Sequence, residues 1–289
     1  MAAGTGATRS RPRIDTMPEL PEVETVRRGL EELVRKGTRI EHVDVRRRDL
    51  RAPVPKDLAR RLEGETLVGF GRWGKYLLWT TPGVTLLCHL GMSGTWRAAP
   101  TGDEREHDHC YVSLAGGLRL AYRDPRRFGL LDLIEPGREA SHPTLASLGP
   151  DPLDERSFTP ACLKLAFAGR RAPVKQLIMD QRLIAGLGNI YAAEALHRAG
   201  IRPRAAAGRL GPARLERLVV AIREVLAAAI ASGGSSIRDF RLTGGGSGYF
   251  QHQFRVYGRE GEPCLSCGAT IQGAVLGGRA SAWCPACQR

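Results

Sequence analysis

The sequence predicts an α+β protein in which an antiparallel β-sandwich is followed by a helical domain and a small cysteine-rich module. Three observations support this fold class. Residues 38–136 contain short β-rich runs between turn residues, residues 153–250 show apolar spacing typical of helices, and the last segment holds four of the seven cysteines. With 289 residues the chain is long enough for two domains of ordinary size.

Positive charge is the unusual feature of the composition. The 43 lysine and arginine residues outnumber the 30 aspartate and glutamate residues, which gives a formal net charge of +13. Such a charge favours a polyanionic partner, nucleic acid first, and leaves a merely soluble cationic protein as the alternative. No apolar stretch of about 18 residues occurs, so we expect no membrane-spanning segment.

The first sixteen residues differ in character from the rest of the chain. Residues 1–16 lack apolar periodicity and the hydrophobic segment of a signal peptide, so we expect a disordered tail or a start codon assigned too far upstream. Folded sequence should begin at Met17. A helix is predicted over residues 21–36, because Pro21 suits its first turn and apolar residues recur at helical spacing at Val23, Val26, Leu30 and Leu33.

Seven short strands are predicted in the N-terminal domain, residues 17–136. They are expected over residues 39–45, 66–70, 76–80, 85–90, 111–114, 118–122 and 130–134. Pro82-Gly83 and Gly116-Gly117 are the clearest hairpin turns. Many short strands at this spacing are typical of an antiparallel sandwich or barrel.

A proline-rich linker, residues 137–152, leads to the predicted helical domain, residues 153–250. Helices are expected over residues 160–168, 174–179 and 189–199. A longer helix has its apolar face at Leu215, Leu218, Val219, Ile222, Val225, Leu226, Ala229 and Ile230. The glycines of residues 243–248 predict a loop before Tyr249.

The terminal module, residues 251–289, contains Cys264-x-x-Cys267 and Cys284-x-x-Cys287. Four thiolates at this spacing can close tetrahedrally on one Zn²⁺, whose binding then folds the module. A pair of redox-active dithiols is the alternative. Four sulfur ligands leave the metal no open position, so we expect a structural ion. Arg279 should lie near a hairpin tip, facing either a phosphate or solvent.

Pro18 and Glu19 are candidate reactive groups. If Met17 were removed, Pro18 would carry a free secondary amine, and an α-amino group titrates nearer to neutrality than lysine does. Such an amine can attack C1′ of a sugar and form an iminium ion, with Glu19 moving protons beside it. A proline that only starts a helix is the alternative.

Three further segments carry candidate nucleic-acid contacts. Lys75 at a hairpin edge is either a phosphate ligand or proton donor, or a charge that protects an edge strand. The turns at residues 89–94 and 124–129 offer Met92, Arg126 and Phe128 as groups that enter an unstacked base step, with core packing of Met92 and Phe128 as the alternative. Gly186-Leu-Gly-Asn189 opens a helix, and we expect its backbone N–H groups to face a phosphate. A tight turn between helices is the alternative explanation for the two glycines.

Together these segments resemble the bacterial formamidopyrimidine-DNA glycosylases, the oxidised-purine branch of the helix-two-turns-helix DNA glycosylases. The resemblance runs from Met17 to Arg289. Its motifs occur in family order: Met17-Pro-Glu-Leu-Pro-Glu-Val-Glu-Thr25, His89-Leu-Gly-Met-Ser-Gly94, Asp124-Pro-Arg-Arg-Phe-Gly129, Gly186-Leu-Gly-Asn-Ile-Tyr191 and the paired C-x-x-C segment. It implies a helix-two-turns-helix DNA-binding domain and a C-terminal four-cysteine zinc finger.

The resemblance also implies a role for each matching residue. Pro18 is the expected Schiff-base nucleophile, Glu19 the neighbouring acid/base and Lys75 a proton donor in β-elimination. Arg279 would contact phosphate and assist δ-elimination. DNA contacts are expected from Met92, His107, Arg126, Phe128, Arg170, Lys175 and Asn189, with Arg170 the loosest match. One structural zinc ion is implied at Cys264, Cys267, Cys284 and Cys287, and no redox cofactor or Mg²⁺.

The implied activity is that of a bifunctional DNA glycosylase and AP lyase that excises oxidised purines such as 8-oxoguanine and formamidopyrimidines from duplex DNA. An endonuclease VIII-like enzyme for oxidised pyrimidines and a noncatalytic zinc-containing DNA-binding homologue are the alternatives. Leu20, Val23 and the Arg126-Arg127-Phe128 run favour the purine branch. We expect a reducing cytoplasm, because the cysteine number is odd and no signal peptide is present. With the resemblance we also expect a bacterial monomer that is associated with the nucleoid.

The sixteen leading residues depart from the family pattern. While they remain attached, the nitrogen of Pro18 is an amide with no available lone pair and cannot form a Schiff base. A misassigned start is therefore favoured over an inactive homologue that still binds DNA.

Overall fold

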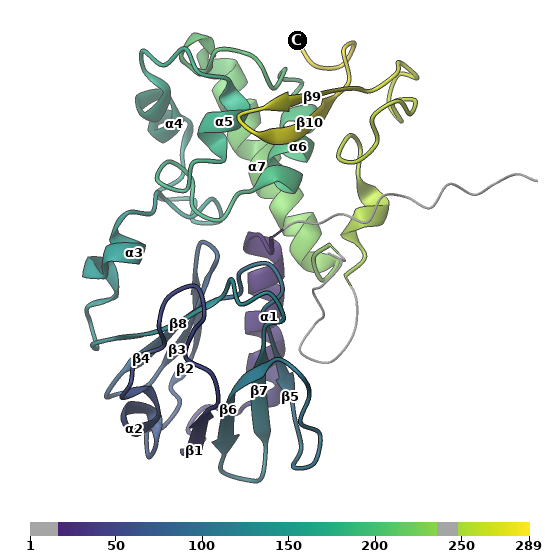
Figure 1. Ribbon diagram of the computed structural model, residues 1–289. Coiled ribbons are helices and arrows are strands. Elements are labelled where there is room, and N and C mark those ends of the chain that lie inside the picture. The colour runs from purple at the N-terminus through teal and green to yellow at the C-terminus, as the bar shows by residue number, and fades with distance from the viewer. Residues whose placement is uncertain (1–16, 236–247) are drawn as a thin grey trace, which may run out of the picture.

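A computed structural model describes residues 17–235 and 248–289. The predicted tail, residues 1–16, and most of the predicted glycine-rich loop, residues 243–247, lie outside the described residues. In Figure 1 a β-sandwich with its leading helix α1 (Leu20–Leu33) lies below a helical domain that carries the hairpin of β9 (Gln272–Leu276) and β10 (Arg279–Trp283). The predicted α+β organisation is confirmed.

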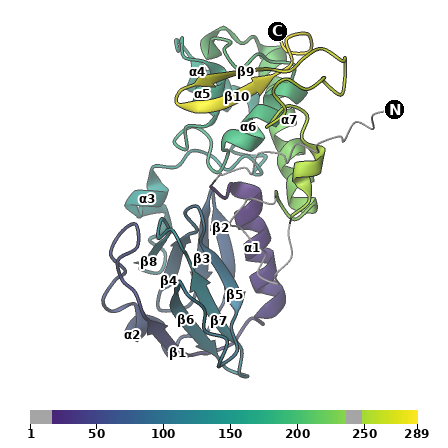
Figure 2. The same cartoon turned by 45° about the vertical axis from the view of Figure 1, so that its right-hand side comes forward.

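Two four-stranded antiparallel sheets form the sandwich, with orders β1-β6-β7-β5 and β2-β3-β4-β8. The bounds of the first sheet are β1 (Ile40–Val45), β6 (Asp108–Leu114), β7 (Arg119–Arg123) and β5 (Thr95–Ala98). Those of the second are β2 (Gly69–Trp73), β3 (Tyr76–Thr80), β4 (Thr85–His89) and β8 (Leu130–Ile134). The two sheets are seen from another side in Figure 2.

The predicted elements of this domain differ from the structure by more than one residue at five places. Helix α1 ends at Leu33 rather than at residue 36, because Val34 is extended. Strand β6 begins at Asp108 rather than at residue 111, since the polar residues Asp108 and His109 interrupt the apolar signal of the strand. The strand expected over residues 66–70 is β2, three residues later, because a two-residue turn at Gly74-Lys75 sets its pairing of Trp73 with Tyr76. Strand β5 was not predicted, since only four residues separate Gly94 from Ala99. The short helix α2 (Leu58–Leu62) was missed because charged residues fill most positions from 57 to 63, leaving a weak apolar signal.

The helical domain contains α3 (Pro143–Ala146), α4 (Pro160–Phe167), α5 (Val174–Ile178), α6 (Asn189–Arg198) and α7 (Pro212–Ala231), with short 3₁₀ turns η1 (Glu139–Ser141), η2 (Ala207–Arg209) and η3 (Phe250–Gln253). The expected helices over residues 160–168, 174–179 and 189–199 each end one residue earlier than predicted. Thr159 starts α4 by accepting the N–H of Cys162, at 3.2 Å. Within the described ranges, no helix is long and apolar enough to cross a membrane.

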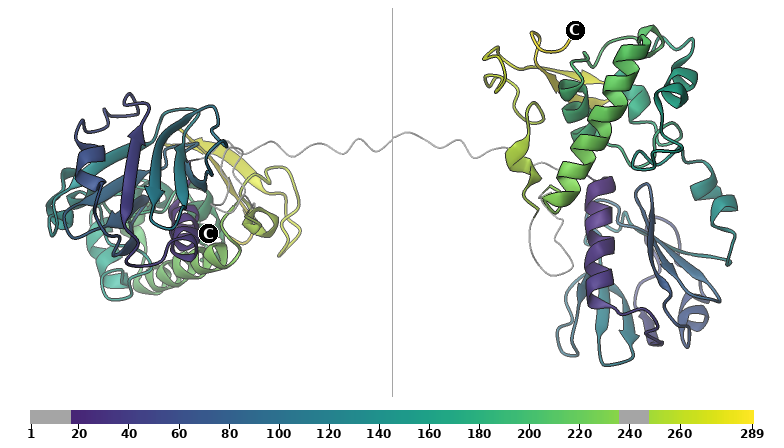
Figure 3. Two further views of the ribbon diagram at one scale, coloured as in Figure 1. Left: turned by 90° about the horizontal axis from the view of Figure 1, so that it is seen from below. Right: turned by 180° about the vertical axis from the view of Figure 1, so that it is seen from behind.

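Helix α1 belongs to both hydrophobic cores. Val23, Val26 and Leu30 pack inside the sandwich, whereas Leu20 packs with the buried side chains of the helical domain. The view from behind in Figure 3 shows α7 reaching the first turn of α1. The first turn of α1 therefore lies at the boundary between the two domains.

A buried ion-pair network supports the same boundary. The guanidinium of Arg72, on β2, donates to Glu24 on α1 at 3.1 Å and to Asp151 in the linker at 2.7 Å. Burial disfavours the Glu24 carboxylate, but hydrogen bonds from Arg27 and Arg28 prevail and lower its pKa to about 2. The network joins the sandwich, the leading helix and the linker.

Replacing Leu20 by alanine should destabilise the protein by about 3 kcal/mol, because the side chain is fully buried in the helical core. Urea denaturation followed by circular dichroism measures the change. Leu165, which is 81% exposed, is the control, and its replacement by alanine should cost less than about 0.5 kcal/mol. Equal losses in the two variants would contradict the assignment of Leu20 to the core.

Candidate active site and nucleic-acid interface

The carboxylate of Glu19 closes the N-terminus of α6. Its two oxygens accept the N–H groups of Gly188 at 2.8 Å, Ile190 at 2.9 Å and Tyr191 at 3.5 Å. A Cβ on Gly188 would lie 2.3 Å from that carboxylate, so only glycine permits the approach. The expectation that these N–H groups face a phosphate is therefore wrong, because a side chain of the protein already occupies the positive end of the helix.

Pro18 is buried next to this carboxylate, between the two domains. The N–H of Leu20 donates to the carbonyl of Gly186 at 3.0 Å, and Glu19 donates its own N–H to Glu22 at 2.9 Å. These bonds fix the backbone on the C-terminal side of Pro18. The hydrogen bonds of Glu19 and Leu20 therefore hold Pro18 in place at the domain boundary.

Two buried carboxyl groups and a lysine share this region. Burial raises the pKa of Glu19, against the opposing charge of Lys75. Burial, together with the charge of Glu19, raises the pKa of Glu22 to about 7. Desolvation lowers the pKa of Lys75, although Glu19 and Glu22 oppose it. Shifts of this kind bring acids and bases closer to neutral pH, where proton transfer is most effective.

The turn between β2 and β3 places Lys75 at the domain boundary. Gly74 adopts a φ of +58°, which favours glycine, and a Cβ there would lie 3.2 Å from the Cβ of Ala185. The predicted hairpin edge therefore packs on the segment that leads into α6. Lys75 is half-buried beside Glu19 rather than extended into solvent from an edge strand.

Arg279 and Lys175 lie together at the β9–β10 hairpin. Both residues line a cleft of about 340 Å³ between the hairpin and α5. Lys175 is 1% exposed, and its ammonium donates to the carbonyl of Ala280 at 2.9 Å and the hydroxyl of Ser281 at 2.6 Å. Arg279 is exposed at the start of β10. Lys175 thus holds the hairpin that presents Arg279.

Asp124 joins the two turns that carry Met92, Arg126 and Phe128. Its carboxylate accepts the hydroxyl of Ser93 at 2.6 Å and the N–H of Gly129 at 2.8 Å, and Ser93 in turn accepts the N–H of Arg126 at 3.0 Å. Asp124 is fully buried. The sequence did not reveal this role, since Asp124 and Ser93 are 31 residues apart and no local pattern pairs them.

The three side chains of these turns lie toward solvent to different extents. Phe128 is 47% exposed, which overturns core packing as its explanation, and the guanidinium of Arg126 lies 5.2 Å from its ring centroid. Met92 is half-buried. An exposed aromatic ring beside a cation is a suitable surface for stacking against a base.

The remaining predicted DNA contacts are dispersed. His107 is half-buried in a left-handed turn with a φ of 72°. Arg170 is exposed in the turn after α4, and its charge acts on Asp180, which also lines the Arg279 cleft. The side-chain oxygen of Asn189 is buried at the start of α6 without a hydrogen-bond partner in residues 17–235 and 248–289.

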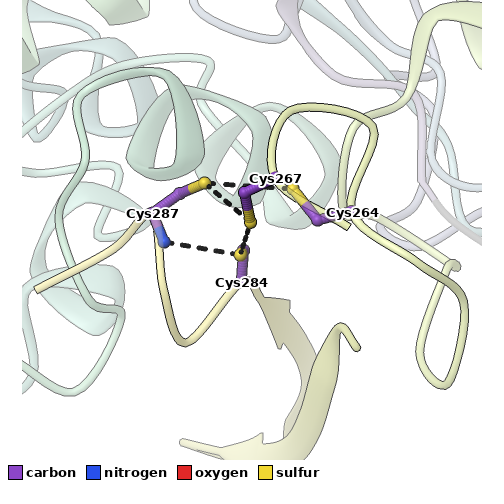
Figure 4. A group of neighbouring side chains, drawn as sticks. All are labelled: Cys264, Cys267, Cys284 and Cys287. Atoms are coloured by element: carbon purple, nitrogen blue, oxygen red, sulfur yellow. Dashed lines mark hydrogen bonds between the residues drawn. The ribbon is translucent and has the colours of Figure 1, made fainter. Parts of the chain in front are cut away.

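The four cysteines of the terminal module converge on one point (Figure 4). Their sulfur atoms all lie within 4.8 Å of one another, and three of the pairs are 3.4, 3.4 and 3.9 Å apart. A tetrahedron with zinc–sulfur bonds of about 2.3 Å requires sulfur–sulfur distances of roughly 3.8 Å. The donor set therefore fits zinc, and the predicted four-cysteine site is confirmed.

The protonation of these thiols depends on their neighbours in the cluster. Burial disfavours the thiolate form of Cys264, but hydrogen bonds from the N–H of Ser266 and the ring of His197 prevail and lower the pKa of Cys264 to about 5. Bonding to the neighbouring Cys267 sulfur raises the pKa of Cys287 to about 12. A divalent ion would remove the repulsion that keeps the second thiol protonated.

Replacing Asp124 by asparagine should destabilise the protein by about 1–3 kcal/mol, because an amide cannot accept from both Ser93 and Gly129 and leaves a buried donor unpaired. Hydrogen exchange at the Gly129 N–H should accelerate. Asp44, 41% exposed in an ion pair with Arg46, is the control, and its replacement by asparagine should cost less than about 1 kcal/mol. Unchanged protection of Gly129 would contradict the role of Asp124.

Comparison with known sequences identifies three segments of the chain. The profile described as "Formamidopyrimidine-DNA glycosylase N-terminal domain" matches residues 17–131. "Formamidopyrimidine-DNA glycosylase H2TH domain" matches residues 148–241, and "Zinc finger found in FPG and IleRS" matches residues 261–289.

Close relatives and solved structures agree with these matches. The formamidopyrimidine-DNA glycosylases of Bdellovibrio bacteriovorus and Rhizorhabdus wittichii are each 50% identical to this chain, over 94% of its length and 100% of theirs. The MutM (Fpg) protein from Thermus thermophilus superposes with a TM-score of 0.83 at 41% identity, over 94% of this chain and 98% of that one. Lactococcus lactis Fpg, solved in complex with DNA containing an abasic site, gives 0.85 at 36% identity, over 94% and 99%. The chain belongs to the formamidopyrimidine-DNA glycosylase family.

Proposed function

We propose that this protein excises oxidised purines from duplex DNA and then cleaves the strand at the resulting abasic site. The observation that carries the proposal is the buried pair Pro18-Glu19 at the domain boundary, where Glu19 is fixed on α6 and Lys75 lies within electrostatic reach. Relatives named formamidopyrimidine-DNA glycosylase, and a relative solved with abasic-site DNA, support it. The activity belongs to base excision repair.

The proposed chemistry begins at the secondary amine of Pro18. Its lone pair attacks C1′ of the damaged nucleotide, the bond from C1′ to the base breaks, and the base leaves with a proton. The C1′–O4′ bond then opens, O4′ takes up a proton, and the nitrogen lone pair forms the C1′=N⁺ bond of an iminium ion, which is an electron sink. Loss of a proton from C2′ expels the 3′ phosphate by β-elimination, and δ-elimination then expels the 5′ phosphate. Water releases the sugar fragment and regenerates the amine.

Three further residues serve these steps. Glu19 has a raised pKa and is adjacent to Pro18, so it exchanges protons with the sugar. Lys75 has a lowered pKa and donates a proton during β-elimination. Arg279, exposed on the hairpin that Lys175 supports, contacts a phosphate and assists δ-elimination.

Recognition of the duplex is assigned to the loops and turns around this centre. Met92, Arg126 and Phe128 fill the space left by the everted nucleotide, and Asp124 keeps their two turns in register. His107, Arg170, Lys175 and Asn189 contribute contacts to the DNA backbone. Zinc, when bound, supplies no chemistry to the reaction and stabilises the finger that carries Arg279. We further propose a monomer that acts at the bacterial nucleoid.

The working enzyme must have a free amine at Pro18. The family profile begins at residue 17, and the relatives match this chain over 94% of its length and all of theirs. We therefore propose that the active form starts at Pro18, after removal of Met17 and everything before it.

Borohydride trapping on a duplex with an abasic site tests this start. A protein expressed from Met17 and processed to Pro18 should give a stable covalent adduct, because the reagent reduces the iminium to a carbon–nitrogen single bond. The 289-residue chain, verified by intact mass, should bind the same DNA without an adduct. Trapping by the verified long chain would overturn the role of Pro18, and no adduct with the processed protein would favour a noncatalytic DNA-binding protein.

Substrate preference separates the purine branch from an endonuclease VIII-like enzyme. The competitor is relevant because Lactococcus lactis Fpg has been solved with DNA containing an oxidised pyrimidine. The value of kcat/KM should be at least about tenfold higher for 8-oxoguanine opposite cytosine than for thymine glycol opposite adenine, a difference of about 1.4 kcal/mol. An abasic duplex cleaved equally well in both sequence contexts is the control. The reverse preference would favour the oxidised-pyrimidine enzyme.

A further inference from the structure

His197, in the last turn of α6, contacts the zinc ligands from outside the four-cysteine set. Its Nε2 lies 3.8 Å from the sulfur of Cys264, and the two residues are 9% and 4% exposed. We propose that His197 is a positioning residue for the zinc finger, which donates its Nε2 hydrogen to the Cys264 thiolate.

The negative charge of a zinc site with four thiolates explains why a donor to Cys264 would be stabilising. Zinc with four thiolates carries a net charge of −2 in a partly buried knuckle, so N–H donors to sulfur lower the cost of burial. Backbone N–H groups already serve two sulfurs: Ser266 donates to Cys264 and Cys287 donates to Cys284, both at 3.4 Å. His197 adds a side-chain donor to the backbone N–H groups of Ser266 and Cys267 at Cys264.

Zinc binding also fixes which atom carries the hydrogen. A sulfur bound to zinc has lost its proton, so the hydrogen between Cys264 and His197 must be on Nε2. A donor at this position is favoured by the negative end of α6, because His197 lies in the last turn of that helix. Charge on the ring is not required.

The same face of α6 is fitted to the finger at two other positions. Glu194, one turn earlier, accepts the N–H groups of Arg255, Val256 and Tyr257 at 2.8–3.0 Å. Ala193 packs in the small apolar cluster of the finger with Cys264 and Cys284. His197 thus completes a docking face that begins with Glu194.

The cysteine cluster is accessible from a cavity, so the effect of His197 on zinc binding can be measured with a chelator. A cavity of about 760 Å³ beside α6 is lined by His197, His252, Leu265, Ser266 and Cys287, among others. Small chelators can therefore approach the cysteine cluster from this side. We expect that loss of the His197 donor weakens zinc binding.

Two matched variants isolate the donor. His197→Gln keeps a side-chain N–H of similar reach, whereas His197→Met has similar length and no donor. Competition with a chromogenic zinc chelator should give a Kd at least about tenfold higher for the Met variant and within about threefold of the parent for the Gln variant. His252→Met, at a residue that lines the same cavity, is the control and should leave the Kd unchanged.

Cobalt substitution distinguishes hydrogen bonding from packing. Removing a hydrogen bond from a thiolate raises the energy of its lone pair, so the sulfur-to-cobalt band of His197→Met should move to longer wavelength while that of His197→Gln stays in place. Equal Kd values and equal spectra for all three proteins would overturn the proposal, as would weakened binding in both variants without a band shift.

A measurement on the unmodified protein tests the proposal even where a variant fails to fold. The ¹H–¹⁵N spectrum of the zinc-loaded protein should show a hydrogen on Nε2 of His197. An unprotonated Nε2 would refute the donation to Cys264.

Discussion

The contact between the Glu19 carboxylate and the N-terminus of α6 is the constraint on which the site depends. It joins the second residue of the Pro18-Glu19 pair to backbone groups about 170 residues later. Because the carboxylate receives three N–H groups and the positive end of a helix dipole, it can be buried without a counter-ion in direct contact. Pro18 is held at the domain boundary as a consequence.

The charges around this contact depend on one another. The charge of Glu19 raises the pKa of Glu22. At both Lys75 and Lys175, the charge of Glu19 raises the pKa and that of Arg279 lowers it. Burial alone would neutralise each group, and the opposite charges limit that effect. Changing any member therefore alters the protonation of the rest, so kinetic effects of single substitutions in this cluster will not add.

The sequence predicts local features well and distant partners poorly. The helices α4, α5 and α6 were found within one residue and the C-x-x-C pairs were recognised directly, because their signals lie within one turn or one loop. The end of α1 was placed three residues too late. The start of α6 was interpreted as a phosphate site because nothing near Gly188 indicates that Glu19 would reach it. Likewise, Asp124 belongs to a recognisable motif, but its partner Ser93 is on another turn. The bond from the Lys175 ammonium to a hairpin more than 100 residues away could not be predicted either, because no local pattern pairs Lys175 with Ala280.

Helix α1 has a consequence beyond the reactive centre. Its first turn is embedded in one hydrophobic core and its later turns in the other, and Arg72 bridges the same seam. Hinging of the domains about this seam would have to open apolar surface and separate buried charges. A ligand that spans both halves therefore meets a seam whose opening costs free energy. For a double helix, the strain of eversion then falls on base stacking and curvature of the nucleic acid, and lesions that already weaken stacking will be the easiest to extract.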